Sequence, residues 1–223
     1  YTILEILRKQ KKRLVQISTD EVYGSLENGS ATEDFRYNPS NPYAATKASA
    51  ELLVNSYVKT YDLDCVITRC TNNYGPRQFY EKLIPKTIFL ANQDKKIPIY
   101  GTGKNIRDWI FVDDHCEAVY NVLLNGKSGE SYNISSNNEL DNTTIVKKIL
   151  EIMNKSGNLI EFVDDRPGHD LRYSLDSSKI RKSLKWAEKT AFQEGLEKTI
   201  EWYLKSDNQS ITKESLNPTP WKK

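Results

Sequence analysis

Leu14-Val15-Gln16-Ile17-Ser18 is the segment that decides the fold, because this short apolar run with β-branched residues predicts a buried strand of a parallel sheet. A helix is expected over residues 43–61, where apolar side chains recur with a period of 3.6 residues. The next strand is Asp64-Cys65-Val66-Ile67-Thr68-Arg69. Strand, crossover helix and strand in this order predict a right-handed parallel unit, and therefore an α/β protein.

The chain after residue 76 has shorter and more mixed elements. Helices are predicted near residues 83–92, 113–124, 143–153, 177–184 and 193–204, and strands near residues 97–100, 107–112, 131–134 and 159–163. Elements of this kind suit a small α/β lobe that packs on a doubly wound parallel sheet.

Composition argues against several classes of protein. The 223 residues include 32 basic and 30 acidic ones, so neither a nucleic-acid partner nor a membrane-surface partner is indicated. No apolar run approaches the ~18 residues that span a bilayer, and no signal peptide is visible. Cys65, Cys70 and Cys116 lack CxxC spacing, which argues against a disulfide framework and a metal site. We therefore expect a reduced, cytoplasmic location.

Tyr43 and Lys47 are separated by one helical turn, so both side chains point to the same face of the predicted helix. A free tyrosine has a pKa of about 10, and a neighbouring ammonium lowers that pKa because it favours the phenolate. The pair can therefore serve as a general base toward a hydroxyl group. The spacing alone is a weak signal, and it gains weight because the helix follows a strand that ends in Ser18 and Thr19.

Thr19, Asp20 and Glu21 lie at the carboxyl end of that strand, which is the edge where ligands bind in open parallel sheets. A purely structural interpretation makes Asp20 a turn cap and Glu21 an exposed charge. A chemical interpretation rests on the rule that adjacent carboxyl groups in a sheltered pocket differ in pKa, so that one acts as acid and the other as base. Elimination of water requires such a division of labour.

Seven motifs together carry a resemblance to a known family. They are found at residues 18–24 (STDEVYG), 41–47 (NPYAATK), 72–76 (NNYGP), 81–85 (EKLIP), 98–101 (PIYG), 106–109 (IRDW) and 165–170 (DRPGHD). In this order they resemble the dTDP-glucose 4,6-dehydratases, which belong to the extended short-chain dehydrogenase/reductase superfamily. The resemblance extends from about residue 14 to residue 203. It implies a Rossmann-like doubly wound parallel sheet and a smaller mixed α/β substrate-binding lobe.

The resemblance also implies a mechanism, the NAD-dependent conversion of dTDP-glucose to dTDP-4-keto-6-deoxyglucose by a hydro-lyase. Tyr43 would accept the proton of the sugar 4-hydroxyl while C4 gives its hydride to NAD⁺. Lys47 would lower the pKa of Tyr43 and hold the nicotinamide ribose, and Thr19 would bind the 4-oxygen. Glu21 would then remove the C5 proton while Asp20 protonates the departing 6-hydroxyl, after which the hydride returns to C6.

Binding residues follow from the same resemblance. The cofactor contacts would be Ser18, Tyr43, Lys47 and Asn73. The substrate contacts would be Thr19, Asn72, Lys82, Leu83, Pro98, Tyr100, Arg107, Asn142, Asp165, Arg166 and His169. Arginine suits a diphosphate because its guanidinium binds phosphate oxygens through two parallel hydrogen bonds. The structural alternative for Arg107 is an ion pair with Asp108. No metal is implied, and the helix over residues 43–61 would form a homodimer interface.

The sequence departs from the superfamily pattern at its beginning. Members carry a Gly-rich loop after their first strand, and no such loop exists in this chain. The chain opens with Tyr1 inside a helical pattern. We therefore expect the first βα units to be missing, and the isolated chain to bind NAD poorly and to be inactive. Residues 1–75 would then be the C-terminal portion of an NAD-binding Rossmann domain. Residues 76–206 would be mainly the nucleotide-sugar lobe, with segments returning to the sheet, and residues 207–223 a loosely ordered tail.

Other functions are weighed against the dehydratase. A nucleotide-sugar epimerase or decarboxylase would lack the adjacent carboxyl groups of Asp20 and Glu21. A non-catalytic member that only binds nucleotides would be expected to lose the tyrosine, the lysine or the carboxylates, all of which are present. A UDP-glucose 4,6-dehydratase stays open, because thymidine and uridine nucleotides differ by one methyl group and such a contact discriminates modestly.

Overall fold

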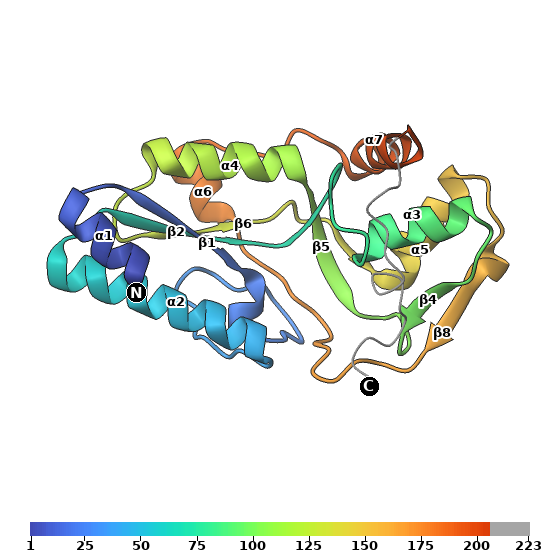
Figure 1. Ribbon diagram of the computed structural model, residues 1–223, viewed down its shortest axis with the longest axis horizontal. Helices are drawn as coiled ribbons and strands as arrows, with labels where there is room; N and C mark the ends of the chain where they lie inside the picture. Colours follow the sequence, from blue (N-terminus) through green and yellow to red (C-terminus); the bar gives the residue numbers. More distant parts are fainter. Residues whose placement is uncertain (206–223) are drawn as a thin grey trace.

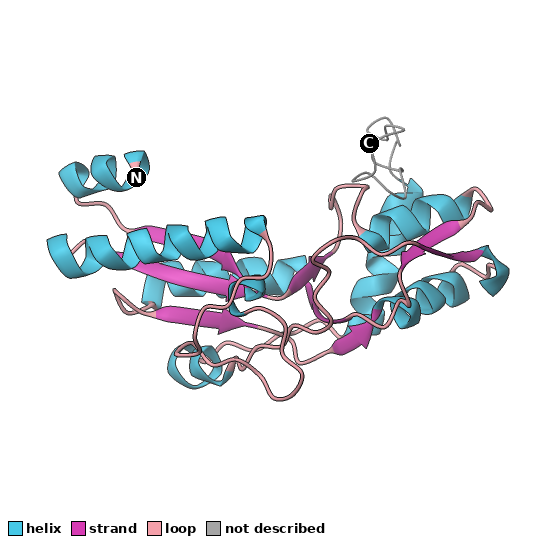
Figure 2. Cartoon of the chain, turned by 90° about the horizontal axis from the view of Figure 1, so that it is seen from below, coloured by secondary structure: helices cyan, strands magenta, loops and turns pink. Residues whose placement is uncertain are grey.

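The computed structural model describes residues 1–205, which form an elongated α/β molecule (Figure 1). The helices are α1 (Thr2–Gln10), α2 (Pro42–Tyr61), α3 (Leu83–Asn92), α4 (Val112–Asn125), α5 (Asn142–Ile152), α6 (Ser178–Leu184) and α7 (Phe192–Lys205), with 3₁₀ turns η1 (Asp20–Tyr23) and η2 (Gly157–Leu159). The strands are β1 (Leu14–Thr19), β2 (Cys65–Cys70), β3 (Asn72–Tyr74), β4 (Ile97–Tyr100), β5 (Ile106–Phe111), β6 (Ser131–Ile134), β7 (Glu139–Asp141) and β8 (Ile160–Val163). These elements gather into two groups along the long axis, with loops crossing between them (Figure 2).

The first group is built on a parallel sheet with strand order β1-β2-β6. Helices α1 and α2 lie on one face of this sheet and α4 lies on the other (Figure 1). Successive side chains of a strand point to opposite faces, and β2 shows this directly. Cys65 and Ile67 are buried in a cluster with α1 and α2, whereas Val66 is buried with residues of α4 and α6. The predicted strand–helix–strand unit is therefore confirmed.

The second group contains two small sheets. Strand β5 pairs in parallel with β3 and antiparallel with β7, and β4 pairs in parallel with β8. Helices α3, α5 and α7 cover an aromatic core that includes Tyr74, Trp109 and Phe111. Only Thr71 separates β2 from β3. The chain therefore runs straight from the first sheet into the second, and the carboxyl end of the first sheet faces the second group.

Several expectations need correction or stay predictions. Strand β1 is not fully buried: it is the edge strand of the three-stranded sheet, and Ile17 is 40% exposed. Strands β3 and β7 were not expected from the sequence. The division into domains at residue 75 stays a prediction. The predicted tail, residues 207–223, lies outside the described residues. None of the helices within residues 1–205 has the length and hydropathy that a membrane span needs.

A buried ion pair joins the turn after β1 to α2 and β2. Arg69 donates from Nε and Nη2 to Oε2 of Glu51 over 2.9 and 2.6 Å, and the side chains are 3% and 0% exposed. The rings of Tyr23 and Tyr37 lie against the guanidinium, at 5.0 and 5.3 Å from their centroids. Because Tyr23 belongs to η1, the cluster holds the turn that carries Asp20 and Glu21 against α2.

Replacing Glu51 with Leu should strongly destabilise the fold. The substitution leaves the Arg69 guanidinium buried without its carboxylate, and breaking such a pair costs about 3–5 kcal/mol of unfolding free energy. Urea unfolding of the complete protein that carries this chain measures the change. The matched control is Glu201→Gln, which removes an exposed pair with Lys205 and should leave the transition where it is. Equal midpoints for the two variants would contradict this account.

Candidate active site

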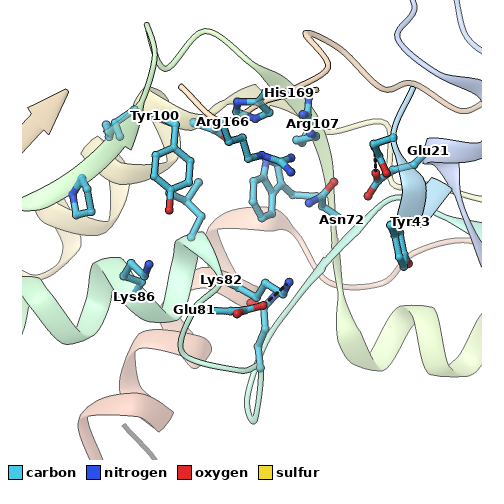
Figure 3. A pocket seen from close by; sticks show the side chains of 17 residues that line it. Glu21, Tyr43, Asn72, Glu81, Lys82, Lys86, Tyr100, Arg107, Arg166 and His169 are labelled. Atoms are coloured by element: carbon cyan, nitrogen blue, oxygen red, sulfur yellow. Dashed lines mark hydrogen bonds and ion pairs between the residues drawn. The ribbon is translucent and has the colours of Figure 1, made fainter. Parts of the chain in front are cut away.

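A cavity of about 670 Å³ lies between the carboxyl end of the first sheet and the second group of elements. Its lining residues come from η1, α2, β3, α3, β4, β5, α5 and the segment after β8. Figure 3 shows Glu21 and Tyr43 together at one end, Tyr100 and Lys86 at the other, and Arg107, Arg166 and His169 along one side. The cavity is therefore elongated, with carboxylate and phenol at one end and cationic side chains beside it.

The turn η1 places the two adjacent carboxyl groups in different surroundings. Thr19 begins the turn, and its Oγ1 accepts a hydrogen bond from the Glu21 backbone N–H and donates to Oδ1 of Asp20 over 3.1 Å. Asp20 is 4% exposed, and its Oδ2 has no hydrogen-bond partner within residues 1–205. Glu21 instead lines the cavity. The turn thus separates a buried carboxyl group from an accessible one.

Burial, followed by the neighbouring charge of Glu21, raises the pKa of Asp20 to about 7. A carboxyl group with this pKa retains a proton on a large fraction of molecules near neutral pH, as a general acid must. The acid role of Asp20 stays a prediction, and a pKa in this range suits it.

Asn41 connects Glu21 to the start of α2. Its Oδ1 accepts from the backbone N–H of Ala44 over 2.9 Å and caps the helix, and Pro42 occupies the first turn. Its Nδ2 donates to Oε2 of Glu21 over 3.1 Å. A single amide therefore fixes Glu21 relative to the helix turn that carries Tyr43. Asn41 was absent from the residues selected in the sequence, although it lies inside one of the quoted motifs.

Tyr43 lines the cavity beside the turn, but its pKa is raised and not lowered. Burial, then the charges of Glu21, Cys70 and Asp20, raise the pKa of Tyr43, while a hydrogen bond with Thr19 opposes them. The ammonium of Lys47 donates instead to the backbone carbonyl of Ile17 over 2.6 Å. The net shift is therefore upward, because burial and then the neighbouring charges raise the pKa, and the effect of Lys47 on Tyr43 stays a prediction.

Cationic side chains surround the middle of the cavity. Arg107 is 5% exposed, and it donates to the backbone carbonyls of Ile106, Asp170 and Leu171. These bonds hold the guanidinium in place. The alternative ion pair of Arg107 with Asp108 is not formed, because the Asp108 carboxylate accepts from Ser136 and the backbone N–H groups of residues 136–138.

Lys82 and Lys86 face the cavity from α3 and the residue before it. Lys82 forms an exposed ion pair with Glu81 at 2.9 Å (Figure 3). Lys86 is 7% exposed, and burial lowers its pKa. A buried ammonium in a cavity wall is a natural partner for an anionic ligand. Lys86 was missed in the sequence, where its helical spacing from Lys82 was the available signal.

His169 lines the cavity, whereas Asp165 supports it from outside. Nδ1 of His169 lies 2.6 Å from Oδ1 of Asp165. Burial lowers the pKa of His169 although Asp165 opposes this, so the imidazole is neutral near pH 7 and donates from Nδ1. Asp165 was predicted to contact substrate, but in the structure it orients His169 and does not line the cavity.

The residues predicted from the sequence fall into two sets when they are compared with the lining of the cavity. Predicted residues that line the cavity are Glu21, Tyr43, Asn72, Lys82, Leu83, Pro98, Tyr100, Arg107, Asn142, Arg166 and His169. Predicted residues outside its lining are Ser18, Thr19, Asp20, Lys47, Asn73 and Asp165. Lining residues that were not selected are Asn41, Gln78, Glu81, Lys86, Ile99 and Trp109. Most of these last residues fall inside the quoted motifs, so the motifs themselves were the signal.

Two predicted cofactor contacts have unused polar atoms. Oγ of Ser18 and Oδ1 of Asn73 are buried and have no hydrogen-bond partner within residues 1–205. Nδ2 of Asn73 is engaged by Thr71 O and Cys70 Sγ, which fixes the direction of the amide. Polar atoms left unpaired in this way suit a ligand with amide and hydroxyl groups. No cluster of His, Cys, Asp or Glu in the described part of the chain could hold a metal ion.

Comparison with known proteins agrees with this geometry. The family model described as GDP-mannose 4,6 dehydratase matches residues 1–199. The low-salt glycan biosynthesis protein Agl12 of Haloferax volcanii is 51% identical over 195 residues, which cover 87% of this chain and 63% of the relative. The dTDP-glucose 4,6-dehydratase of Mycobacterium tuberculosis is 47% identical over 214 residues, covering 94% of this chain and 64% of the relative. The chain thus spans less than two thirds of the length of these curated relatives.

A solved structure is similar over the same region. The dTDP-glucose 4,6-dehydratase of Bacillus anthracis in complex with NAD matches with a TM-score of 0.90 and 45% identity, over 93% of this chain and 67% of that one. Sequence, fold and cavity therefore agree, and the chain belongs to the family described as GDP-mannose 4,6 dehydratase, with dTDP-glucose 4,6-dehydratases among its relatives.

Proposed function

We propose that the protein is a hydro-lyase that dehydrates a nucleotide-linked hexose, converting dTDP-glucose to dTDP-4-keto-6-deoxyglucose with NAD as a bound cofactor. The observation that carries the proposal is that an accessible Glu21 and Tyr43 share one end of a cation-lined cavity, while the buried Asp20, with a pKa of about 7, is adjacent to Glu21 in the same 3₁₀ turn. The relatives named dTDP-glucose 4,6-dehydratase support it.

The shape of the cavity suits a nucleotide sugar. The hexose would occupy the end with Glu21, Tyr43 and Asn72, and the nucleoside would extend toward Tyr100. The diphosphate would then lie between the side chains of Arg107 and Arg166 on one wall and the lysines of α3 on the other. Guanidinium and ammonium groups supply the donors that phosphate oxygens require.

Bound NAD would supply the hydride chemistry of the reaction, at C4 of the sugar and then at C6. Ser18, Lys47 and Asn73 would hold it at the carboxyl end of β1 and β2. Tyr43 would take the proton of the 4-hydroxyl during C4 oxidation in its phenolate form, which the hydrogen bond with the hydroxyl of Thr19 favours. Lys47 reaches the same edge of the sheet, where it is already bound to the carbonyl of Ile17.

Elimination then depends on the two carboxyl groups. Once C4 is a ketone, the hydrogen on C5 is acidic, and Glu21 removes it as a base. Asp20 gives its proton to the 6-oxygen, which leaves as water. When the hydride returns to C6, Glu21 returns a proton to C5. Tyr43 then releases the 4-hydroxyl proton to solvent and Asp20 takes one up from solvent, so the protons balance over one turnover.

The decisive test is the mass of the product. The complete protein that carries this chain, incubated with dTDP-glucose and NAD, should yield a keto sugar nucleotide lighter by one water. A product of unchanged mass with inverted configuration at C4 would instead make the protein an epimerase. UDP-glucose run in parallel decides between the thymidine and uridine nucleotides, which the residues leave open.

The buried acid predicts a pH dependence. Elimination needs protonated Asp20, whose pKa is about 7, so the rate of water loss should fall roughly tenfold per pH unit well above that value. Oxidation at C4 does not use this proton and should not decline over the same range. Rapid-quench analysis of the product from pH 6 to pH 9 separates the two steps, and a flat elimination rate would remove Asp20 as the acid.

We also propose a cytoplasmic homodimer formed through α2. The helix exposes Leu52, Leu53 and Tyr61, which are 55%, 43% and 50% exposed, and the three cysteines are free. Exposed apolar residues grouped on one helix commonly mark an interface. Leu53→Glu should convert a dimer to a monomer in sedimentation experiments, whereas Lys147→Glu, which changes an exposed residue of α5, serves as the control. A dimer that persists in Leu53→Glu would contradict this interface.

A further inference from the structure

Glu21 has a second neighbour that the mechanism above does not use. The hydroxyl of Tyr173 lies 3.4 Å from Oε2 of Glu21 and 2.5 Å from Oδ2 of Asp170. Tyr173 is 3% exposed, and the Arg107 guanidinium lies 4.2 Å from its ring centroid. Asp170 is half-buried, and its Oδ2 also accepts from the hydroxyl of Ser40, an exposed residue. These groups form an unbroken line from the base to the surface.

The two distances show which way the phenolic hydrogen points. A hydroxyl carries one hydrogen, so Tyr173 can donate to only one carboxylate at a time. The contact with Asp170 has the length of a charge-assisted hydrogen bond, and the contact with Glu21 is longer than an ordinary one. Tyr173 therefore donates to Asp170, and its oxygen lone pair is free to accept from Glu21 once Glu21 carries a proton.

We propose that Tyr173 and Asp170 form a proton path that exchanges the proton held by Glu21 with solvent during turnover. This inference rests on the proposed function. After Glu21 takes the C5 proton, its protonated oxygen donates to the Tyr173 oxygen, and the phenolic hydrogen moves to Asp170. Asp170 exchanges with water beside Ser40, and the reverse sequence brings a solvent proton to Glu21. One O–H bond forms for each that breaks, so charge and protons balance.

The surroundings favour a transfer that never leaves an ionised phenol. Burial, then the hydrogen bond to Asp170 and the charge of Glu21, raise the pKa of Tyr173 far above its usual range. The phenol therefore stays protonated, and the two proton movements must occur together. Asn41 and Tyr173 both contact Oε2, and a half-turn of the carboxyl group exchanges Oε2 with the oxygen that took the C5 proton. A bound hexose would cover the cavity side of Glu21, which leaves this path as the route to water.

The fate of the C5 proton tests the path. In D₂O, the complete wild-type protein should place deuterium at C5 in most product molecules, because Glu21 exchanges before it returns its proton. Tyr173→Phe removes only the hydroxyl, so the original protium should return to C5 and less than half of the product should carry deuterium. Asp170→Asn keeps the hydrogen-bond acceptor but takes no proton, and it should give the same result.

Controls separate a proton path from a structural role. Tyr132→Phe removes a buried hydroxyl that binds the backbone N–H of Lys127, and it should match the wild type. A variant that is merely distorted turns over more slowly, which gives Glu21 more time to exchange and raises the deuterium content. Loss of deuterium is therefore specific to the path. Product incubated without enzyme gives the background exchange.

The outcomes are distinguishable. Deuterium in most of the product of Tyr173→Phe or Asp170→Asn overturns the proton path alone and leaves the dehydratase intact. Absence of any dehydrated product from the wild type overturns the proposed function, and the proton path with it. Retention of protium in both variants, with normal incorporation in Tyr132→Phe, supports the path.

Discussion

Replacing Glu21 with Gln should stop elimination of water while oxidation at C4 continues. The amide keeps the shape of the side chain but cannot accept a proton, so the C5 hydrogen stays in place. Loss of a general base lowers kcat by about 10²–10⁴-fold. The oxidised sugar and reduced cofactor should then accumulate in a single turnover, because the hydride has no C6 acceptor. Absorbance of the reduced nicotinamide follows the first step, and mass spectrometry of quenched samples follows the second.

Two comparisons make the Glu21 result specific. Glu117→Gln alters an exposed carboxylate of α4 that pairs with Lys189, and it should leave both steps unchanged. Deuterium from D₂O should not enter C5 in Glu21→Gln. Entry of deuterium at the wild-type rate would show that another group removes the C5 proton, and would remove Glu21 from the mechanism.

Replacing Tyr43 with Phe should stop the reaction one step earlier. The phenolate form of Tyr43 takes the proton of the 4-hydroxyl in the proposed mechanism, so loss of this group should slow C4 oxidation by about 10²–10⁴-fold. Without the ketone the C5 hydrogen is no longer acidic, and therefore elimination and C5 exchange should disappear together even though Glu21 is intact. Stopped-flow absorbance of the bound cofactor measures the step directly.

The control for Tyr43 is Tyr120→Phe, which changes a tyrosine of α4 that is 62% exposed. Cofactor reduction at the wild-type rate in Tyr43→Phe would rule out the phenol as base. Lys47→Met provides a second comparison. In this structure the ammonium of Lys47 donates to the Ile17 carbonyl, and the removal of this ammonium should weaken cofactor binding.

The local sequence pattern was sufficient to predict most of the helices and strands. The limits of α3, β4 and β6 agree with their predicted ranges, because α3 carries a helical repeat, β4 is a short run of apolar residues and β6 alternates polar with apolar residues. Strands β3 and β7 have three residues each, and they exist through their pairing with β5. Pairing between distant segments leaves little trace in a short stretch of sequence, so these strands were not predictable.

At the site, too, the sequence predicted some features, whereas others became visible only in the folded chain. The motifs placed Glu21, Tyr43 and the cations together, because strand ends of a parallel sheet meet at one edge. They did not show that Asp165 supports His169 instead of lining the cavity, or that Asn41 ties Glu21 to α2. These relations join segments that meet only in the folded chain.

The sequence by itself determined the α/β class and the family, and it predicted which residues serve as acid, base and phenol, because these inferences depend on residue type and local spacing. Only the tertiary structure decided the direction in which the pKa values of those groups shift. Burial of Asp20, followed by the charge of Glu21, raises its pKa to about 7, and burial followed by neighbouring charges raises the pKa of Tyr43. The adjacency of Asp20 and Glu21 is visible in the sequence, whereas the desolvation of Asp20 and Tyr43 arises only when the chain folds.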